Sequence, residues 1–405
     1  MEYIVNNRFF LILLDFKLVY SDLIPAFILN GRNVVTLEGL KKKSFYKHMQ
    51  KILLEDDFNF CSNCFESNIL LFYYFLENEI VSKSDILGYR KSLKCNCMDV
   101  NTFLSLYLKA EELYRKMANV KVYYPESFNI LSNLFNKNLN NYIIYNELDF
   151  KKNPDLFNRE TPIDNFFIVG NFEKFNKVSL RGNFLEMGPC VTYNEILRIG
   201  KKNIPSLFYE FISKFNDKIY LNSINLANGF YYKNTVFDIY PLLISLDAQI
   251  EFKNVLTKKT YVFSAYNLNR AEYIANRNTV LITKFKFPMM NLWNRSFYHK
   301  IFFNTLSFDI LEESDIIFIC ILLNIKRDII NDFLLKIFYD DKVIVIKDFQ
   351  ILLLNKSLPL SFSEIENSLK MLDKNIRDSK NFNIGERNLK LIKNFYLDIL
   401  MSFNF

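Results

Sequence analysis

Four of the chain's six cysteines stand close together, and no other sequence feature restricts the fold and chemistry of this protein as much. Cys61 and Cys64 form a C-x2-C pair, and Cys95 and Cys97 form a C-x-C pair after residues 65–94. Such a grouping indicates a metal site in a reducing compartment rather than disulfides. Four thiolates suit zinc or iron–sulfur. The C-x-C spacing favours iron–sulfur, and it leaves structural zinc or an empty relic of a site open.

Each cysteine pair is expected at the start of a helix. Apolar residues recur at helical spacing after both pairs, and Asp99 stands where an N-cap residue belongs. Helix N-termini carry a partial positive charge that stabilises thiolates. The first apolar stripe consists of Phe65, Ile69, Phe72, Tyr73, Leu76 and Ile80, and the second of Phe103, Leu106, Tyr107, Ala110 and Leu113.

Composition argues against several other classes of protein. No stretch has the ~18 apolar residues that a membrane span needs, and the apolar run Phe9–Leu14 is too short for a signal peptide. We therefore expect a cytoplasmic protein. The net charge of +7 is spread along the chain, and its densest basic run, Lys41–Lys43, favours a solvated face over nucleic-acid binding. The two histidines, His48 and His299, stand far from other candidate groups, so no catalytic residue is predicted.

The remaining sequence predicts a mixture of strands and helices. Cys190 and Cys320 stand alone in apolar surroundings and are expected to be small core residues. The expected elements are strands and turns over 1–40, a hairpin of strands at 248–255 and 260–264, a strand over 284–287 that stops at Pro288, a buried strand or helix at 316–323, and helices opening at Tyr124 and spanning 361–372 and 388–400.

The cysteine segment resembles the second iron–sulfur domain of the molybdenum hydroxylases, the family of xanthine dehydrogenase, aldehyde oxidase and carbon monoxide dehydrogenase. The resemblance is carried by C61-S-N-C64 and K94-C-N-C97. It implies that these four cysteines hold one 2Fe–2S cluster in a four-helix domain. The family's glycines after each pair are absent, because Phe65 and Met98 stand there instead.

The flanking segments resemble other domains of the same family, in the order found in the small subunit of bacterial xanthine dehydrogenases. Gly31–Leu40 is similar to the end of the ferredoxin-like first domain. The last cysteine of that domain's own cluster aligns with Asp22, and its earlier cysteine loop would lie before Met1, so the resemblance implies no first cluster. Met187–Glu195 is similar to the FAD-binding domain, and Ser314–Ile316 to the domain that follows it.

The resemblance implies an α+β multidomain fold with four parts. We expect remnant ferredoxin-like strands over 1–41 and an all-helical 2Fe–2S domain over 42–120. A PCMH-type FAD-binding α+β domain is expected over 121–290. The last part, 295–405, is expected to be an α+β domain of the carbon monoxide dehydrogenase flavoprotein C-terminal type.

The resemblance also implies which residues would lie beside FAD. These residues are Asn146, Ser223, Asn225, Asn228 and Asp238. The family's first diphosphate loop is rich in glycine, because only a bare backbone approaches phosphate closely. In this chain a tyrosine replaces that glycine, and the paired glycines of the second loop align with serine and isoleucine. Both FAD binding and its loss therefore stay open, and in the second case these residues would be turn and cap residues.

The resemblance implies an electron-transfer subunit of a xanthine dehydrogenase-like oxidoreductase. A partner subunit would carry molybdopterin and oxidise the substrate, and electrons would pass through the 2Fe–2S cluster to FAD and an acceptor such as NAD. Two alternatives remain. The chain could be a structural subunit that docks the partner without FAD, or a zinc-bearing interaction module. The sequence names neither the substrate nor the acceptor.

Overall fold

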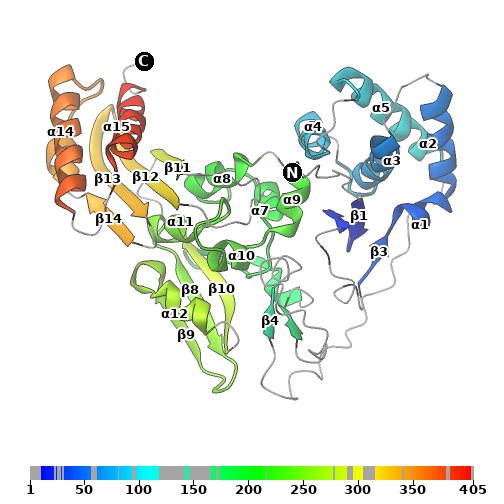
Figure 1. Cartoon of the computed structure of the whole chain (residues 1–405), viewed down its shortest axis with the longest axis horizontal. Helices are drawn as coiled ribbons and strands as arrows, with labels where there is room; N and C mark the ends of the chain where they lie inside the picture. Colours follow the sequence, from blue (N-terminus) through cyan, green and yellow to red (C-terminus); the bar gives the residue numbers. More distant parts are fainter. Residues whose placement is uncertain are drawn as a thin grey trace, which may run out of the picture. The chain divides into compact units, whose positions relative to one another are not determined.

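The computed structural model divides the chain into two compact units (Figure 1). The first unit comprises Met1–Val169, Thr192–Asn194 and Phe215–Asn225, and the second comprises Gly170–Val191, Glu195–Lys214 and Leu226–Phe405. The predicted mixture of helix and sheet is confirmed, and the four finer domain boundaries stay predictions. The structure describes residues 11–21, 24, 29, 32–55, 62–80, 82–93, 97–117, 142–145, 166–169, 173–215, 217–276, 279–289, 295–303, 315–339, 342–346, 348–379 and 384–402.

A small antiparallel sheet begins the first unit and confirms strands within the predicted range 1–40, although residues 37–40 lie in a helix, which Thr36 caps by accepting from the Gly39 N–H. It contains β1 (Leu11–Leu14), β2 (Lys17–Tyr20) and β3 (Val34–Val35) in the order β2-β1-β3. Asp15 and Phe16 both adopt positive φ, of 45° and 67°, which is the backbone of a tight two-residue hairpin turn. A second pair of strands, β4 (Tyr142–Ile144) and β5 (Phe166–Ile168), is parallel.

The predicted helical segment after residue 42 is confirmed. The helices in this part of the first unit are α1 (Leu37–Lys41), α2 (Ser44–Glu55), α3 (Ser62–Glu77), α4 (Lys83–Ser92) and α5 (Val100–Lys116). Phe103, Leu106, Tyr107 and Ala110 of the second predicted stripe are buried along α5. The rings of Phe72 and Phe103 pack with centroids 5.1 Å apart, so the two predicted stripes face each other.

Buried polar side chains join distant segments of the first unit. The Tyr20 hydroxyl on β2 lies 2.7 Å from the Ser92 carbonyl oxygen and 3.0 Å from a carboxylate oxygen of Asp217. Asp217 caps helix α9 (Lys218–Ser223) by accepting from the Tyr220 N–H. A second chain of bonds starts at Asn194, whose amide donates to the Tyr89 hydroxyl at 2.7 Å and to Asn222 at 2.6 Å.

Removing the Tyr20 hydroxyl should destabilise the first unit. In Tyr20→Phe the Ser92 carbonyl oxygen and Asp217 lose a buried donor, and a hydrogen bond of this kind contributes roughly 1–2 kcal/mol. We expect a loss of that size in the free energy of unfolding, measured by urea denaturation. Tyr266→Phe is the control, because that side chain is 55% exposed. Equal effects of the two substitutions would contradict the structural role of the Tyr20 hydroxyl.

The second unit contains a five-stranded antiparallel sheet, which includes the predicted hairpin and the strand ending at Pro288. Its strands are β6 (Val178–Arg181), β7 (Phe184–Met187), β8 (Gln249–Asn254), β9 (Thr260–Ser264) and β10 (Val280–Pro288), in the order β6-β7-β10-β8-β9. The helices of this region are α7 (Tyr193–Ile199, whose first two residues belong to the first unit), α8 (Ser206–Ser213), α10 (Leu226–Tyr231), α11 (Tyr240–Ser245) and α12 (Arg270–Ala275), with short 3-10 turns η7 (Glu173–Phe175) and η8 (Ala265–Asn267).

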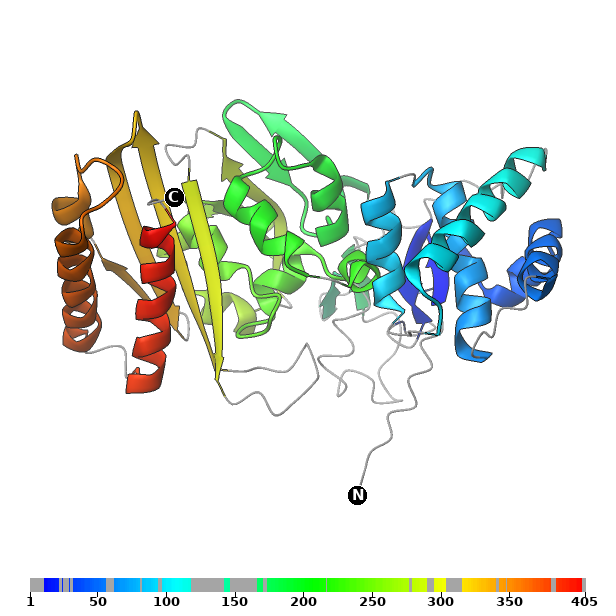
Figure 2. The ribbon, with the colours of Figure 1, turned by 90° about the horizontal axis from the view of Figure 1, so that it is seen from above.

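A four-stranded antiparallel sheet and three helices complete the second unit (Figure 2). Alternate residues of β12 are buried against α14 and α15, and Cys320 is buried on the same strand, as predicted. Cys190 is also buried. Ser361 and Glu364 form a capping box at the start of α14. The elements are β11 (Arg295–Phe303), β12 (Asp315–Lys326), β13 (Ile329–Tyr339), β14 (Lys342–Ile346), α13 (Asp348–Leu353), α14 (Phe362–Asp378) and α15 (Glu386–Met401).

Candidate cofactor sites

Both predicted cysteine pairs fall next to helix starts. Cys64 is the third residue of α3, and Cys97 precedes the Asp99 cap of α5. The Asp99 carboxylate accepts from the N–H groups of Asn101 and Thr102, at 2.8 and 3.1 Å. Cys97 is exposed. The geometry of the whole quartet stays untested, because Cys61, Cys95 and the Cys64 side chain lie outside the described residues.

Helices α3 and α5 run parallel. Phe72 packs on Phe103, and three residues further along α3 the Phe75 ring lies 5.8 Å from that of Tyr107. Near the helix C-termini, the Tyr114 hydroxyl donates to Glu77 at 2.8 Å. These contacts advance in the same order on both helices, so the helices share a direction. Phe72 is ten residues after the start of α3 and Phe103 is three after the start of α5, so the N-terminus of α3 extends about 10 Å beyond that of α5. Each N-terminus carries a partial positive charge that favours a thiolate close to it.

Helix α4 holds the turn that carries Cys97. The Arg90 guanidinium donates to the main-chain oxygen of Met98, and it lies 5.6 Å from the centroid of the Phe103 ring. Among the residues that the structure describes, no three His, Cys, Asp or Glu side chains gather as a metal site. Since only Cys97 of the four cysteines has a described side chain, the cluster site stays a prediction.

Two of the residues predicted to bind flavin belong to the first unit. Ser223 ends α9, and Asn225 follows it with an antiparallel bridge to Thr192. Both side chains are 1% exposed. Tyr145 follows β4 and is also fully buried. Asn146 lies outside the described residues.

Two more of the predicted flavin-binding residues, Asn228 and Asp238, belong to the second unit and bond to other residues of the protein. Asn228 lies in α10, where its amide donates to the Tyr232 hydroxyl at 3.1 Å. Asp238 stands before α11 and forms an ion pair with Arg270 at 2.9 Å. Its carboxylate also accepts from the N–H groups of Asn234 and Tyr240, both at 2.9 Å. The Asp238 carboxylate therefore provides a hydrogen-bond acceptor at the start of α11 and the counter-charge for a buried guanidinium.

The described flavin candidates are buried, and their assignment to a flavin site stays a prediction. Asn228 is 0% exposed and Asp238 1% exposed. Both side chains are covered by the protein's own atoms, as turn and core residues are.

Sequence reasoning missed Arg270. This arginine is 2% exposed, its Nε donates to the Phe230 carbonyl oxygen at 2.7 Å, and its guanidinium lies over the Tyr240 ring at 4.9 Å. Buried arginines are rare unless they are paired. No local signal marked this position, because Asp238 lies 32 residues earlier in the chain.

Comparison with known proteins gives likeness in structure alone. No protein-family model and no curated protein matches the sequence. Quinoline 2-oxidoreductase from Pseudomonas putida 86 aligns with TM-score 0.48 and 10% identity, over 67% of this chain and 92% of that chain. A Cu,Mo-CO dehydrogenase gives 0.46 and 9%, over 65% and 88%. Carbon monoxide dehydrogenase from Hydrogenophaga pseudoflava gives 0.46 and 8%, over 66% and 90%. These values assign no function to this chain.

Among the described helices, none is both long enough and apolar enough to cross a lipid bilayer.

Proposed function

We propose that this chain is the iron–sulfur subunit of a xanthine dehydrogenase-like molybdenum hydroxylase. Cys61, Cys64, Cys95 and Cys97 would hold one 2Fe–2S cluster, which accepts and releases single electrons. The chain would carry electrons from a molybdopterin-bearing partner subunit through the cluster to FAD, and FAD would pass them to an acceptor such as NAD, in the cytoplasm. The observation that supports this proposal best is that α3 and α5 pack together in the same direction and that each begins next to one of the two cysteine pairs.

The protein's own contribution at that site is electrostatic and positional. The helix N-terminus next to each cysteine pair favours anionic ligands, and the Arg90 contact to the Met98 carbonyl oxygen fixes the turn next to Cys97. Groups that orient metal ligands are often as necessary as the ligands themselves. Arg90 is therefore the candidate positioning residue of this region.

A second candidate function is favoured by the burial of Asn228 and Asp238. In that function the chain is a structural subunit that docks a partner and does not bind FAD. Flavin released on acid treatment of the purified protein would reject this candidate. FAD binding would then have to use main-chain groups or residues such as Asn146.

Iron content tests the proposed function directly. We expect full-length protein purified without oxygen to contain two iron atoms and acid-labile sulfide per chain, with visible absorbance. Cys97→Ala should lower the affinity for iron at least ~tenfold, the loss known for groups that merely support a ligand. Cys190→Ala is the matched control, because this buried cysteine is not part of the quartet. Zinc instead of iron, or equal iron in both variants, would reject the proposal.

A further inference from the structure

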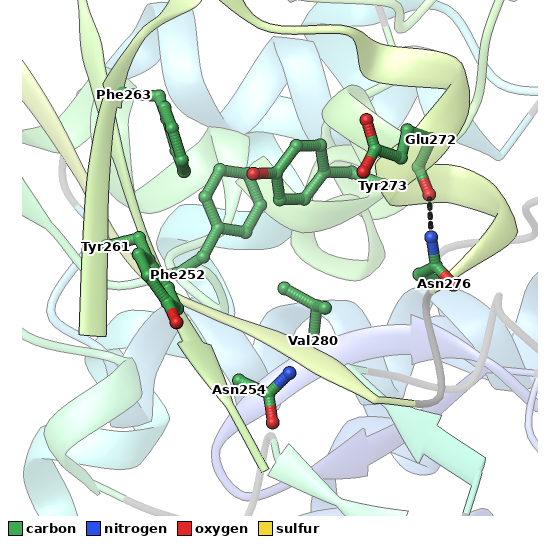
Figure 3. A pocket seen from close by; sticks show the side chains of 8 residues that line it. All are labelled: Phe252, Asn254, Tyr261, Phe263, Glu272, Tyr273, Asn276 and Val280. Carbon is green, nitrogen blue, oxygen red and sulfur yellow. Dashed lines mark hydrogen bonds between the residues drawn. The ribbon is translucent and has the colours of Figure 1, made fainter. Parts of the chain in front are cut away.

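A pocket lined by aromatic rings lies in the second unit between β8, β9, α12 and the start of β10 (Figure 3). Its rings belong to Phe252, Tyr261, Phe263 and Tyr273, and Glu272 stands at its edge. We call this site the aromatic pocket. Its volume is about 180 Å³. That volume suits a group of a few heavy atoms, and it is too small for a dinucleotide.

The strand register explains why the rings converge. Phe252 and Tyr261 are cross-strand partners on β8 and β9, and Phe263 is paired with Ile250. Residues two apart on a strand share a face, so the three rings project to the same side of the sheet. Tyr273 of α12 closes over them, with its ring centroid 4.2 Å from that of Phe252 and 5.9 Å from that of Phe263.

Glu272 is the one charged residue among the described residues that line the aromatic pocket, and Lys259, whose backbone pairs with that of Asn254, is exposed and does not line it. Glu272 is exposed, and among the described residues no basic side chain forms an ion pair with its carboxylate. Lys253 is adjacent to Phe252 on β8, and successive strand residues point to opposite faces, so its side chain leaves the sheet on the other side. The Asn254 side-chain oxygen already accepts from the N–H groups of Leu256 and Thr257, at 3.0 and 2.8 Å.

The hydrogen-bonding capacity of the pocket is low. The Asn276 amide donates to the main-chain oxygen of Glu272 at 2.9 Å, a bond drawn in Figure 3. Most of the wall is ring surface, which offers few acceptors. A primary ammonium needs three acceptors, whereas a fully methylated ammonium needs none. Ring faces attract both kinds of ammonium, and the fully methylated one loses less hydration free energy when it leaves water.

We propose that the aromatic pocket binds the methylated ammonium head of a small free organic cation of the choline type. The ring surfaces of Tyr261, Phe263 and Tyr273 supply cation–π attraction, since Phe252 is 0% exposed beneath Tyr273. Glu272 supplies the opposite charge at the edge. Anions are disfavoured by the same carboxylate and by the negative faces of the rings. This binding is independent of the cysteine quartet and of any flavin.

Calorimetric titration of the full-length protein with choline chloride tests the proposal. The control ligand is 3,3-dimethylbutan-1-ol, which has choline's shape with carbon in place of the charged nitrogen. We expect choline to bind on the order of tenfold more tightly, because the cation–π term depends on the charge. Equal affinities would overturn the proposal. Tighter binding of a trimethyl-lysine peptide than of choline would also overturn it, because the occupant would then be a modified protein.

Two variants locate the binding. Tyr261→Ala and Glu272→Gln should each weaken choline binding roughly three- to tenfold. Tyr266→Ala, a neighbouring exposed tyrosine outside the pocket, should not change it. Tyr261 is 43% exposed and Glu272 is also exposed, so both variants should keep the folded state, which thermal unfolding verifies. Unchanged binding in Glu272→Gln would overturn the proposal even if Tyr261→Ala failed to fold.

Discussion

Asp238→Asn is expected to lower the free energy of unfolding by about 3–5 kcal/mol, the cost of breaking a buried ion pair by removing one partner. Asparagine has nearly the same shape as aspartate, so the packing is kept and the charge is lost. Arg270 would then remain 2% exposed without its counter-ion. The loss should appear as a lower midpoint of urea-induced unfolding at neutral pH, with an unchanged slope.

An exposed ion pair in the same unit provides the control. Glu386→Gln makes the same change from carboxylate to amide opposite Arg377, at a pair whose Glu386 side chain is 76% exposed. Surface pairs contribute little, so this midpoint should stay nearly constant. Exchanging Arg270 for methionine in the Asp238→Asn background should recover part of the loss, because no buried charge is left.

The same measurement separates two roles for Asp238. If Asp238 only contacted flavin, Asp238→Asn would lower the cofactor content and leave the stability of the cofactor-free protein unchanged. If Asp238 has only a structural role, the substitution should lower that stability and leave flavin contacts unaffected. Equal unfolding midpoints for Asp238→Asn and the unchanged protein would therefore contradict the assignment of Asp238 to the Arg270 pair and the start of α11.

Gly188→Ala is expected to destabilise the second unit by about 3 kcal/mol, the upper part of the range for overpacking. A Cβ atom at Gly188 would lie 2.1 Å from the Phe175 carbonyl oxygen and 2.4 Å from its carbon. Those atoms are backbone and cannot rotate away. The Phe175 oxygen also accepts from the Cys190 N–H at 3.0 Å, so moving η7 would break a hydrogen bond as well.

A second glycine of the same unit tests whether close approach is the reason. A Cβ atom added at Gly385, the N-cap residue of α15, would meet no described atom within 4 Å. Gly385→Ala should therefore cost at most about 1 kcal/mol, from poorer capping alone. Differential scanning calorimetry of both variants gives the comparison. Equal losses would show that the contact with Phe175 does not determine the effect.

Local sequence signals predicted the elements that local physics controls. The apolar stripes before Leu113 predicted α3 and α5, and Asp99 does cap α5 through the N–H groups of the first turn. The hairpin of β8 and β9 followed from alternation and turn residues. Each of these features is determined by residues within a few positions of one another.

Contacts over long sequence separations were not predictable in the same way. Asp238 was expected to bind flavin, yet its guanidinium partner is Arg270, and nothing in either local sequence indicates the pairing. The bond between Asn194 and Tyr89 spans 105 positions. The aromatic pocket likewise depends on α12 closing over a hairpin, which periodicity does not reveal.

The first unit is assembled from three separate stretches of chain, and this has a consequence during synthesis. When the ribosome has released residues 1–120, the Tyr89 hydroxyl and the Leu18 carbonyl oxygen still lack Asn194 and Asn222. The N-terminal part of the unit therefore cannot form all of its native hydrogen bonds until residue 225 has emerged. Such a chain closes its longest loops last, so its N-terminal part depends on residues of the same unit that lie about a hundred positions later in the chain.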